Sequence, residues 1–296
     1  MGRSETLFGG TLRAAGSAQV QSSALKLKNS KSMKVHPPSK RVWPPPPGPL
    51  AVVKSKGSTP TERYLAELAE HTFLSMWSYP NLWREQRANS ANGDGKELCD
   101  LLVVFDEHLI IFSDKLIEYK QHHDPVVSWC RWYRASIKKS ADQVFGAERW
   151  IRKFPDRIFL DSRCTKRFPV ALVPNEKLII HRIVVARGAG AACRAHFGGG
   201  SGSLMIAPDI IGDGHLLHAR ASPELPKPND EGLAAGPFMI GQIDPDQGYV
   251  HVLDDVSLDV LMSNLDTVQD FVNYLVAKER FALSGRLIGA TGEEDL

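Results

Sequence analysis

Two short apolar segments follow one another closely in the chain, with a polar triplet between them. The first spans Glu97–Phe105 and the second spans Leu109–Lys115, and Asp106-Glu107-His108 separates them. Both segments are rich in β-branched residues, which is typical of buried strands. The polar residues between them favour a tight turn. The pattern therefore predicts a β-hairpin that is buried in a sheet.

Capping signals and apolar periodicity predict a helix before this hairpin. Thr59 fits the N-cap position, Pro60 fits the first helical position, and Glu62 closes a capping box. The helix is expected to extend to about Trp77. One face of it carries the mainly apolar residues Tyr64, Leu65, Leu68, Thr72 and Met76.

A longer amphipathic helix is predicted from near Pro125 to near Lys153. Apolar residues recur on one side of its helical wheel, namely Trp129, Tyr133, Ile137, Val144, Ala147 and Ile151. The opposite side carries the basic residues Arg131, Arg134, Lys138, Arg149 and Arg152. Such a basic stripe suits contact with a phosphate backbone, but a plain solvated helix face is the favoured interpretation.

Further strands and a last helix complete the pattern. The strand-like segments are 82–84, 157–160, 177–186, 204–206, 237–241 and 249–253. A final helix is expected over about 265–281, with Asp266 or Thr267 as its cap. Strands mixed with helices in this way predict an α/β (α+β) fold, in which a mixed central sheet is flanked by helices.

Composition divides the chain into three parts. Residues 1–58 are rich in Pro, Ser and Lys, include the proline run at 43–48, and are predicted to be disordered. Residues 59–190 form the predicted α/β core, and residues 191–296 form a C-terminal α+β extension packed on it. The sequence shows no clear stop signal at its end, which is compatible with a truncated extension.

The bulk composition is that of a globular protein without a strong net charge. The 296 residues are 43% hydrophobic and 24% charged, and the formal net charge is +2. Any contact with nucleic acid must therefore come from a local basic patch. The four cysteines are widely spaced, which favours a reducing, cytoplasmic environment. No apolar run approaches the roughly 20 residues that a membrane span needs.

A glycine-containing motif gives only a weak signal. Gly188-Ala-Gly190 follows a predicted strand, as a dinucleotide-binding loop would, but Cys193 occupies the third glycine position. A nucleotide-dependent enzyme is therefore the least favoured functional class. The segment is interpreted as a surface loop.

The residues that could carry chemistry gather at one end of the hairpin. Antiparallel pairing would bring Asp100 near Asp114 and Lys115. Burying two carboxylates and an ammonium group is costly unless they pair or bind a cation. Carboxylate oxygens suit Mg²⁺, with Mn²⁺ as the alternative, and a nearby lysine can position an attacking water.

In this order of acid, second acid and lysine, the chain resembles the PD-(D/E)XK nuclease superfamily, which has the restriction-endonuclease-like fold. The resemblance covers roughly residues 59–187. It implies that Asp100 and Asp114 bind Mg²⁺ or Mn²⁺ and that Lys115 positions the water. It further implies that the first helix supplies an acid, Glu62, and that a glutamine on the later helix, Gln143, faces the metal.

The motif departs from that family in its spacing. A D/E-x-K motif puts acid and lysine on one strand face, whereas Asp114 and Lys115 are adjacent, and Ser113 occupies the acid position. A bulge could re-aim Asp114. Glu118 and Lys120 have the strict spacing but lie beyond the apolar segment. In a third interpretation the site has decayed and only the fold remains.

Two functional hypotheses follow. The first is a metal-dependent phosphodiesterase, a nuclease, that contacts the nucleic-acid backbone through Arg131, Arg134 and Lys138. The second is a catalytically inactive protein of nuclease fold that binds a protein partner through its proline-rich arm. The six tryptophans fit this second hypothesis, because aromatic residues are enriched at interfaces.

Overall fold

The computed structural model describes residues 52–85, 95–217 and 236–296 of the chain. The proline run at 43–48 lies outside the described residues. In chain order the principal elements are α1 (Pro60–Trp77), β1 (Ser78–Glu85), β2 (Gly95–Phe105), β3 (His108–Leu116), α2 (Pro125–Tyr133), α3 (Lys139–Lys153), β4 (Ile158–Phe159), β5 (Ile179–Arg187), α4 (Gly190–Phe197), β6 (Met205–Ile211), α5 (Gly214–Leu217), β7 (Met239–Gln242), β8 (His251–Leu253), α6 (Asp255–Asn264) and α7 (Val268–Leu283). Each helix and strand predicted from the sequence is present, with some ends shifted.

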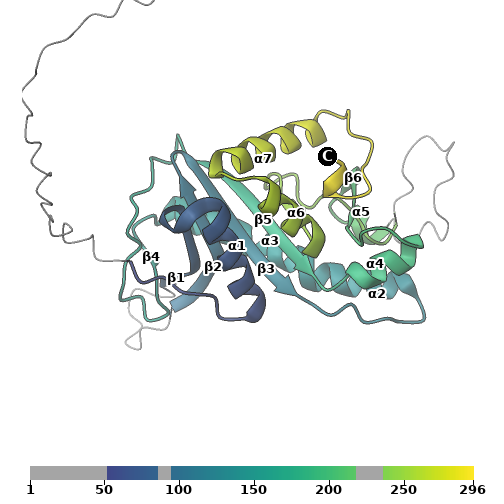
Figure 1. Cartoon of the computed structure of the whole chain (residues 1–296), viewed down its shortest axis with the longest axis horizontal. Coiled ribbons are helices and arrows are strands. Elements are labelled where there is room, and N and C mark those ends of the chain that lie inside the picture. The colour runs from purple at the N-terminus through teal and green to yellow at the C-terminus, as the bar shows by residue number, and fades with distance from the viewer. Residues whose placement is uncertain (1–51, 86–94, 218–235) are drawn as a thin grey trace, which may run out of the picture. The chain divides into compact units, whose positions relative to one another are not determined.

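Six of the strands form one mixed sheet in the order β4-β1-β2-β3-β5-β8. β1, β2 and β3 are antiparallel neighbours, whereas β5 runs parallel to both β3 and β8. The helical segment α2–α3 provides the long crossover that parallel pairing of β3 with β5 requires. This arrangement confirms the predicted mixed central sheet flanked by helices (Figure 1). β6 and β7 form a separate two-stranded sheet.

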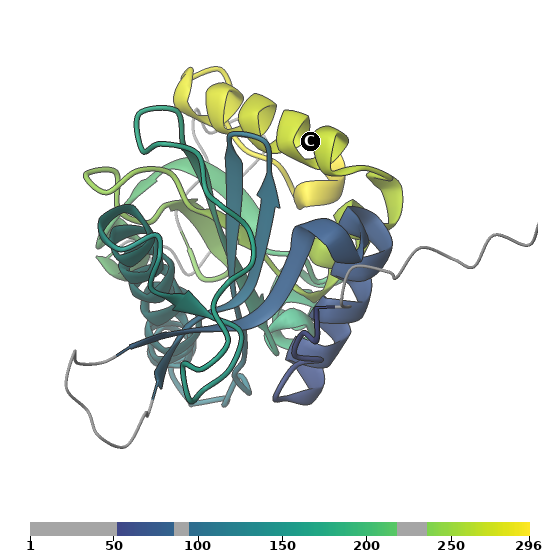
Figure 2. The ribbon, with the colours of Figure 1, turned by 90° about the vertical axis from the view of Figure 1, so that its left-hand side faces the viewer.

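Each face of the central sheet packs against a different set of helices. Along β3, Leu109 and Ile111 belong to the core beneath α2 and α3, whereas Ile110 and Phe112 belong to the core beneath α1, α6 and α7. This alternation is the two-residue period of a strand. Figure 2 shows the sheet between α3 and α1. The alternation fixes which helices the later residues of β3 face.

The hairpin turns at Asp106 and Glu107, since Phe105 pairs with His108. Asp106 adopts a φ of +51°, in the left-handed region that aspartate tolerates better than most residues. The β2–β3 pairing then runs as far as Leu101 opposite Phe112, where the ladder ends. Asp100 and Ser113 are each one residue beyond this last pair.

The capping box predicted for α1 is confirmed. The Thr59 hydroxyl accepts the N–H of Glu62 at 3.2 Å. The Glu62 carboxylate in turn accepts the N–H groups of Ser58 at 2.7 Å and of Thr59 at 3.3 Å. These reciprocal bonds satisfy N–H groups that have no partner inside the helix, and they fix its first turn.

The apolar face predicted for α1 is only partly buried. Leu65 and Thr72 are buried, but Tyr64 and Met76 are exposed. Leu74 has a φ of +59° inside the helix, so the helix is kinked there. Met76 follows the kink, and it therefore no longer continues the face that a regular helix would have.

The segment predicted as one long helix is helical throughout, as α2, a π-helical turn at Arg134–Lys138, and α3. Its predicted apolar face is buried and comprises Trp129, Tyr133, Ile137, Val144, Ala147 and Ile151. The predicted basic residues Arg131, Arg134 and Lys138 are exposed. The amphipathic pattern is therefore confirmed, and the π-helical turn, which periodicity does not show, adds a wider turn at its centre.

The C-terminal part of the chain contributes to the central sheet. β8 pairs with β5 as the edge strand, and α6 and α7 cover one face through buried residues such as Phe271. Asp254 caps α6, and Thr267 caps α7. The predicted extension, 191–296, thus shares its sheet with the predicted core. Within the described part of the chain, no helix is long and apolar enough to cross a membrane.

Residues 52–58, predicted to be part of the disordered segment, lie against α1 and β1. The Lys54 ammonium donates to the backbone oxygens of Ser75 and Ser78. The Ser55 hydroxyl donates to the side-chain oxygen of Asn81 at 2.9 Å. The structured part of the chain therefore begins before the predicted helix cap.

Candidate functional site

Asp100 is a buried carboxylate at the point where the β2–β3 ladder ends. It is 6% exposed, and its Oδ2 accepts the backbone N–H of Asp114 at 2.5 Å. Burial, helped by the nearby carboxylates of Glu97 and Glu62, raises the pKa of Asp100 to about 7. Among the described residues Asp100 forms no ion pair. A buried acid that titrates near neutral pH without a counter-ion is typical of functional sites.

Ser113 and Gln143 lie against each other where β3 packs on α3. Ser113 is 0% exposed, and its hydroxyl donates to the side-chain oxygen of Gln143 at 3.3 Å. Ser113 faces α3 because it continues the alternation of Leu109 and Ile111. The glutamine predicted to face the site therefore meets a serine at the position where the family resemblance expects an acid.

Lys115 lies on the same face of β3 as Ser113. Burial, together with the charge of Lys139, lowers the pKa of Lys115, while the charge of Asp100 opposes the shift. Among the described residues Lys115 forms no ion pair within 4 Å. A lysine of lowered pKa beside a buried carboxylate can hold a water and stabilise negative charge that develops on a substrate.

Asp114 belongs to the opposite face of the sheet. Its carboxylate is fully buried and accepts N–H groups of Arg187 at 3.0 to 3.2 Å. Arg187 also donates to Asp255 of α6 at 3.2 Å. Burial raises the pKa of Asp114, and the hydrogen bonds and charge of Arg187 oppose that shift. Asp114 is therefore engaged in an ion-pair network that joins β3, β5 and α6.

The bulge considered for Asp114 is absent from the described strand. β3 pairs with β5 residue by residue, from His108 opposite Ile179 to Leu116 opposite Arg187. In such a regular strand Asp114 and the adjacent Lys115 point to opposite faces, as their spacing alone predicts. The idea that a bulge brings Asp114 to the face of Lys115 is therefore wrong.

Glu62 performs its capping role and also reaches the hairpin. Its carboxylate accepts the Asn81 amide at 2.7 Å, and the same amide donates to Glu97 at 3.0 Å. Burial alone would raise the pKa of Glu62, but the hydrogen bonds it accepts lower it. Burial raises the pKa of Glu97, the acid on the other side of this amide. Glu62 thus supports the strand that carries Asp100 through a shared asparagine.

The alternative pair Glu118 and Lys120 follows the end of β3 at Leu116, and both side chains are exposed. Because they lie outside a strand, the rule that places acid and lysine on one strand face does not apply to them. Of the two lysines, Lys115 is the one whose charge interacts with Asp100.

The basic residues predicted to contact nucleic acid differ in their surroundings. Lys138 donates to Asp213 at 3.2 Å, so its charge is partly neutralised. Arg131 and Arg134 are exposed beside a surface hollow that Asp124 and Val127 also line. Within the described ranges these two arginines form no ion pair. They are the members of the stripe best placed to bind an anion.

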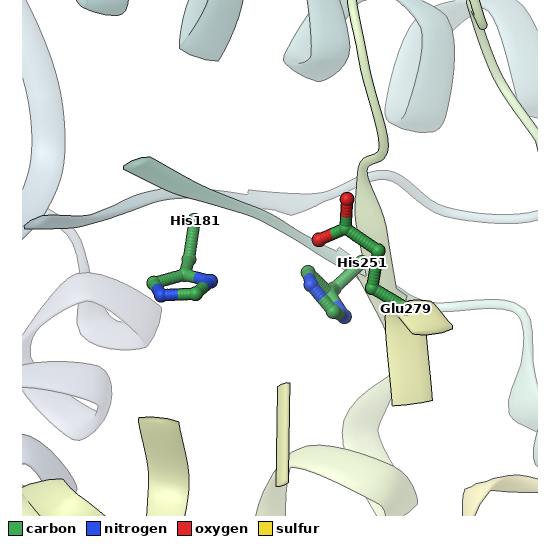
Figure 3. Close-up of side chains that lie close together, drawn as sticks. All are labelled: His181, His251 and Glu279. Carbon is green, nitrogen blue, oxygen red and sulfur yellow. The ribbon is translucent and has the colours of Figure 1, made fainter. Parts of the chain in front are cut away.

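A second group of polar residues, which sequence reasoning missed, lies elsewhere on the sheet. His181 of β5, His251 of β8 and Glu279 of α7 come together (Figure 3). Across the described part of the chain, no other group of three or more His, Cys, Asp or Glu side chains is close enough to hold one metal ion. The sequence signal was a histidine within each of two apolar strand segments.

The residues at the open end of the hairpin include oxygen atoms of the kind that hard divalent cations bind. Asp100 supplies a carboxylate, and Ser113 and Gln143 supply neutral oxygens at the neighbouring position of β3 and on α3. Mg²⁺ commonly takes one or two protein carboxylates and completes its shell with water and substrate phosphate. Because Asp114 pairs with Arg187, Asp100 is the one carboxylate among these residues that could serve as a ligand.

No family model matches the chain, and comparison with curated proteins and with solved structures gives no match. The assignment of function therefore rests on the residues and their geometry.

Proposed function

We propose that the protein is a phosphodiesterase of the nuclease type that depends on Mg²⁺ or Mn²⁺. It would act on nucleic acid at the open end of the β2–β3 hairpin, which is the end opposite the turn. The observation that supports it best is Asp100, which is buried, lacks an ion pair among the described residues, and has a pKa of about 7. A buried acid without a counter-ion is costly, and such groups are retained where they bind a cation or transfer a proton.

In the proposed mechanism Asp100 is the charged ligand of the cation, and Ser113 and Gln143 offer neutral oxygens. The cation, when bound, lowers the pKa of a water and withdraws charge from the phosphate. Lys115 holds that water in place and stabilises the negative charge that develops on the phosphate. Arg131 and Arg134 hold the backbone of the nucleic acid. Asp114 has a structural role, as the buried partner of Arg187.

Cleavage of plasmid, single-stranded DNA and RNA in Mg²⁺, Mn²⁺ or EDTA tests this proposal. We expect metal-dependent cleavage that falls by at least about 100-fold in Asp100→Asn and in Lys115→Met, the scale for losing one preorganised electrostatic group. Lys120→Met is the matched control, because Lys120 is exposed and follows the end of β3. Loss of cleavage in Lys120→Met, with activity retained in Lys115→Met, would contradict the assigned role of Lys115.

A gain of function sharpens the test. Ser113→Asp restores the acid-x-lysine spacing with Lys115 on one strand face. We expect this variant to bind Mg²⁺ more tightly and to cleave faster than the wild type. Ser113→Asn, of similar size but without the charge, is its control. Equal behaviour of the two variants would show that charge at this position does not assist the metal.

The second candidate is a catalytically inactive protein of the same fold that binds a protein partner. It is favoured by Ser113 at the acid position and by the engagement of Asp114 with Arg187. In this case the wild type cleaves none of the substrates with either metal. Pull-downs with the full chain and with a chain that lacks the proline run at 43–48 would then recover a partner only when that segment is present.

A further inference from the structure

The second polar group lies on the face of the sheet that α7 covers. His181 pairs in register with Ile110, and His251 pairs with Ile183. Both isoleucines belong to the hydrophobic core on that face of the sheet. One ligand atom from each of His181, His251 and Glu279 lies within 4.8 Å of the others. Figure 3 shows the three side chains close together. Three separate elements thus direct nitrogen and oxygen atoms to one place.

The histidines in this group are buried, and most of their nitrogens have no partner. His251 is 1% exposed, and neither of its ring nitrogens has a hydrogen-bond partner among the described residues. The Nδ1 atom of His181, a residue that is 3% exposed, also has none. Buried polar groups are nearly always satisfied, so three such nitrogens beside a carboxylate point to a ligand.

The remaining nitrogen of His181 is held by another histidine. His181 Nε2 lies 3.0 Å from His108 Nδ1, and the two rings are stacked. If Nε2 carries the proton and donates it to His108, the lone pair of His181 resides on Nδ1, the atom without a partner. Outer hydrogen bonds of this kind orient the histidines that bind metals.

Burial, helped by nearby positive charges, favours neutral imidazoles, which is the form that binds a metal. Burial, with the charges of His108 and Arg182, lowers the pKa of His181 to about 4. Burial, with Lys278 first among the neighbouring charges, also lowers the pKa of His251. Both cations have carboxylate partners of their own, Glu148 for Arg182 and Glu293 for Lys278. Their charges therefore oppose a bound metal less than free cations would.

We infer that His181, His251 and Glu279 bind a divalent transition-metal ion, with Zn²⁺ as the probe of choice. Two imidazoles and one carboxylate are a donor set for Zn²⁺ and related borderline ions, and three protein ligands leave a coordination position open. The ion would fasten β8 and α7 to β5. This site is separate from the proposed nuclease site, because Ser113 and Lys115 lie toward the other end of the β3–β5 pairing, and Asp100 of β2 lies beside them.

The test is a Zn²⁺ titration of the untagged full chain after treatment with a chelator, read by calorimetry and by the midpoint of thermal unfolding. We expect one ion per chain and a higher midpoint when it is bound. Co²⁺ in place of Zn²⁺ should give the visible absorption of a site that contains histidine nitrogens. A chain that binds no stoichiometric Zn²⁺ would overturn the inference and leave a buried water as the partner of these nitrogens.

Three variants and two controls locate the ion. Glu279→Gln changes a half-buried side chain and should fold, and His251→Gln removes a nitrogen ligand. His108→Gln removes only the outer hydrogen-bond partner of His181 and should weaken Zn²⁺ binding by roughly 10–100-fold. Glu279→Gln and His251→Gln each remove a ligand and should weaken it by more than that. His71→Gln on the exposed surface of α1 and Asp100→Asn should bind Zn²⁺ as the wild type does. Binding that is unchanged in both Glu279→Gln and His251→Gln would overturn the inference.

Discussion

The end of the hairpin and the histidine group are both buried polar sites on the same sheet, yet burial acts on them in opposite directions. At the hairpin end, removal from water raises the pKa of Asp100 to about 7. In the histidine group it lowers the pKa of His181 to about 4. In each case the low dielectric favours the uncharged form of the group. Burial therefore favours a protonated, neutral carboxyl group at the hairpin end and neutral imidazoles in the histidine group.

Asp114 lies beside Asp100 and differs from both groups. Its backbone N–H donates to Asp100, but its own carboxylate is paired with Arg187. Asp100 and Asp114 are thus joined by a hydrogen bond but differ in their charged neighbours. The carboxylate of Asp114 has an ion-pair partner, and that of Asp100 has none among the described residues. Its ion pair favours a structural role for Asp114, and the lack of an ion pair among the described residues is why Asp100 is proposed as the functional residue.

The largest expected effect comes from breaking the paired aspartate. Arg187→Ala leaves Asp114 as a buried charge without a partner, and it should lower the free energy of unfolding by about 3–5 kcal/mol. Urea unfolding at neutral pH measures this. Arg152→Ala is the control, because Arg152 pairs with Glu148 at a more exposed position, and it should cost less than about 1 kcal/mol. A cost below that value for Arg187→Ala would return Asp114 to the list of candidate metal ligands.

A smaller effect is expected from a change of pH in the absence of metal. Raising the pH should lower folding stability through Asp100 and increase it through His181. The folded-state pKa of Asp100, about 7, exceeds its ordinary value of 3.8, so the folded state takes up the proton first and stability falls as pH rises from 4 to 7. The folded-state pKa of His181, about 4, lies below its ordinary value of 6.5, so stability falls as pH drops from 6.5 to 4.

Two variants separate these contributions in unfolding experiments from pH 4 to pH 8. Asp100→Asn should be more stable than the wild type by about 1–3 kcal/mol at pH 8, with the difference vanishing near pH 4. His181→Gln should lose less stability than the wild type on acidification, again by about 1–3 kcal/mol. If Asp100→Asn is less stable than the wild type at pH 8, the acid is stabilised by an interaction that the proposed site does not contain.

The smallest expected effect concerns the basic stripe. Arg131→Ala and Arg134→Ala should each weaken nucleic-acid binding several-fold and reduce the slope of log affinity against log salt by about 1. Lys138→Ala should change both quantities less, because Asp213 already pairs with Lys138. Fluorescence anisotropy at several salt concentrations measures the slopes. Equal slopes for the wild type and both arginine variants would remove the stripe from the proposed binding surface.

Local signals account for the parts of the fold that the sequence predicted well. The capping box at Thr59 and Glu62, the hairpin around Asp106 and the buried face of the second helix all depend on residues a few positions apart. The kink at Leu74 and the π-helical turn at Arg134–Lys138 were not predicted, since they interrupt a periodicity that the residue pattern continues. The place of β8 beside β5 was also not predicted, because residues far apart in the chain decide it.

The sequence by itself determined the hairpin, its flanking helices, and the nearness of Asp100 to the strand of Lys115, because period, turn residues and caps act over short distances. Only the tertiary structure decided that Asp114 pairs with Arg187, 73 positions later, and that His181, His251 and Glu279 meet. The physical reason is that pairing and desolvation depend on which surfaces the packed sheet and helices bring together. A strand pattern fixes the face on which a charged side chain lies, and the fold fixes what that side chain meets there.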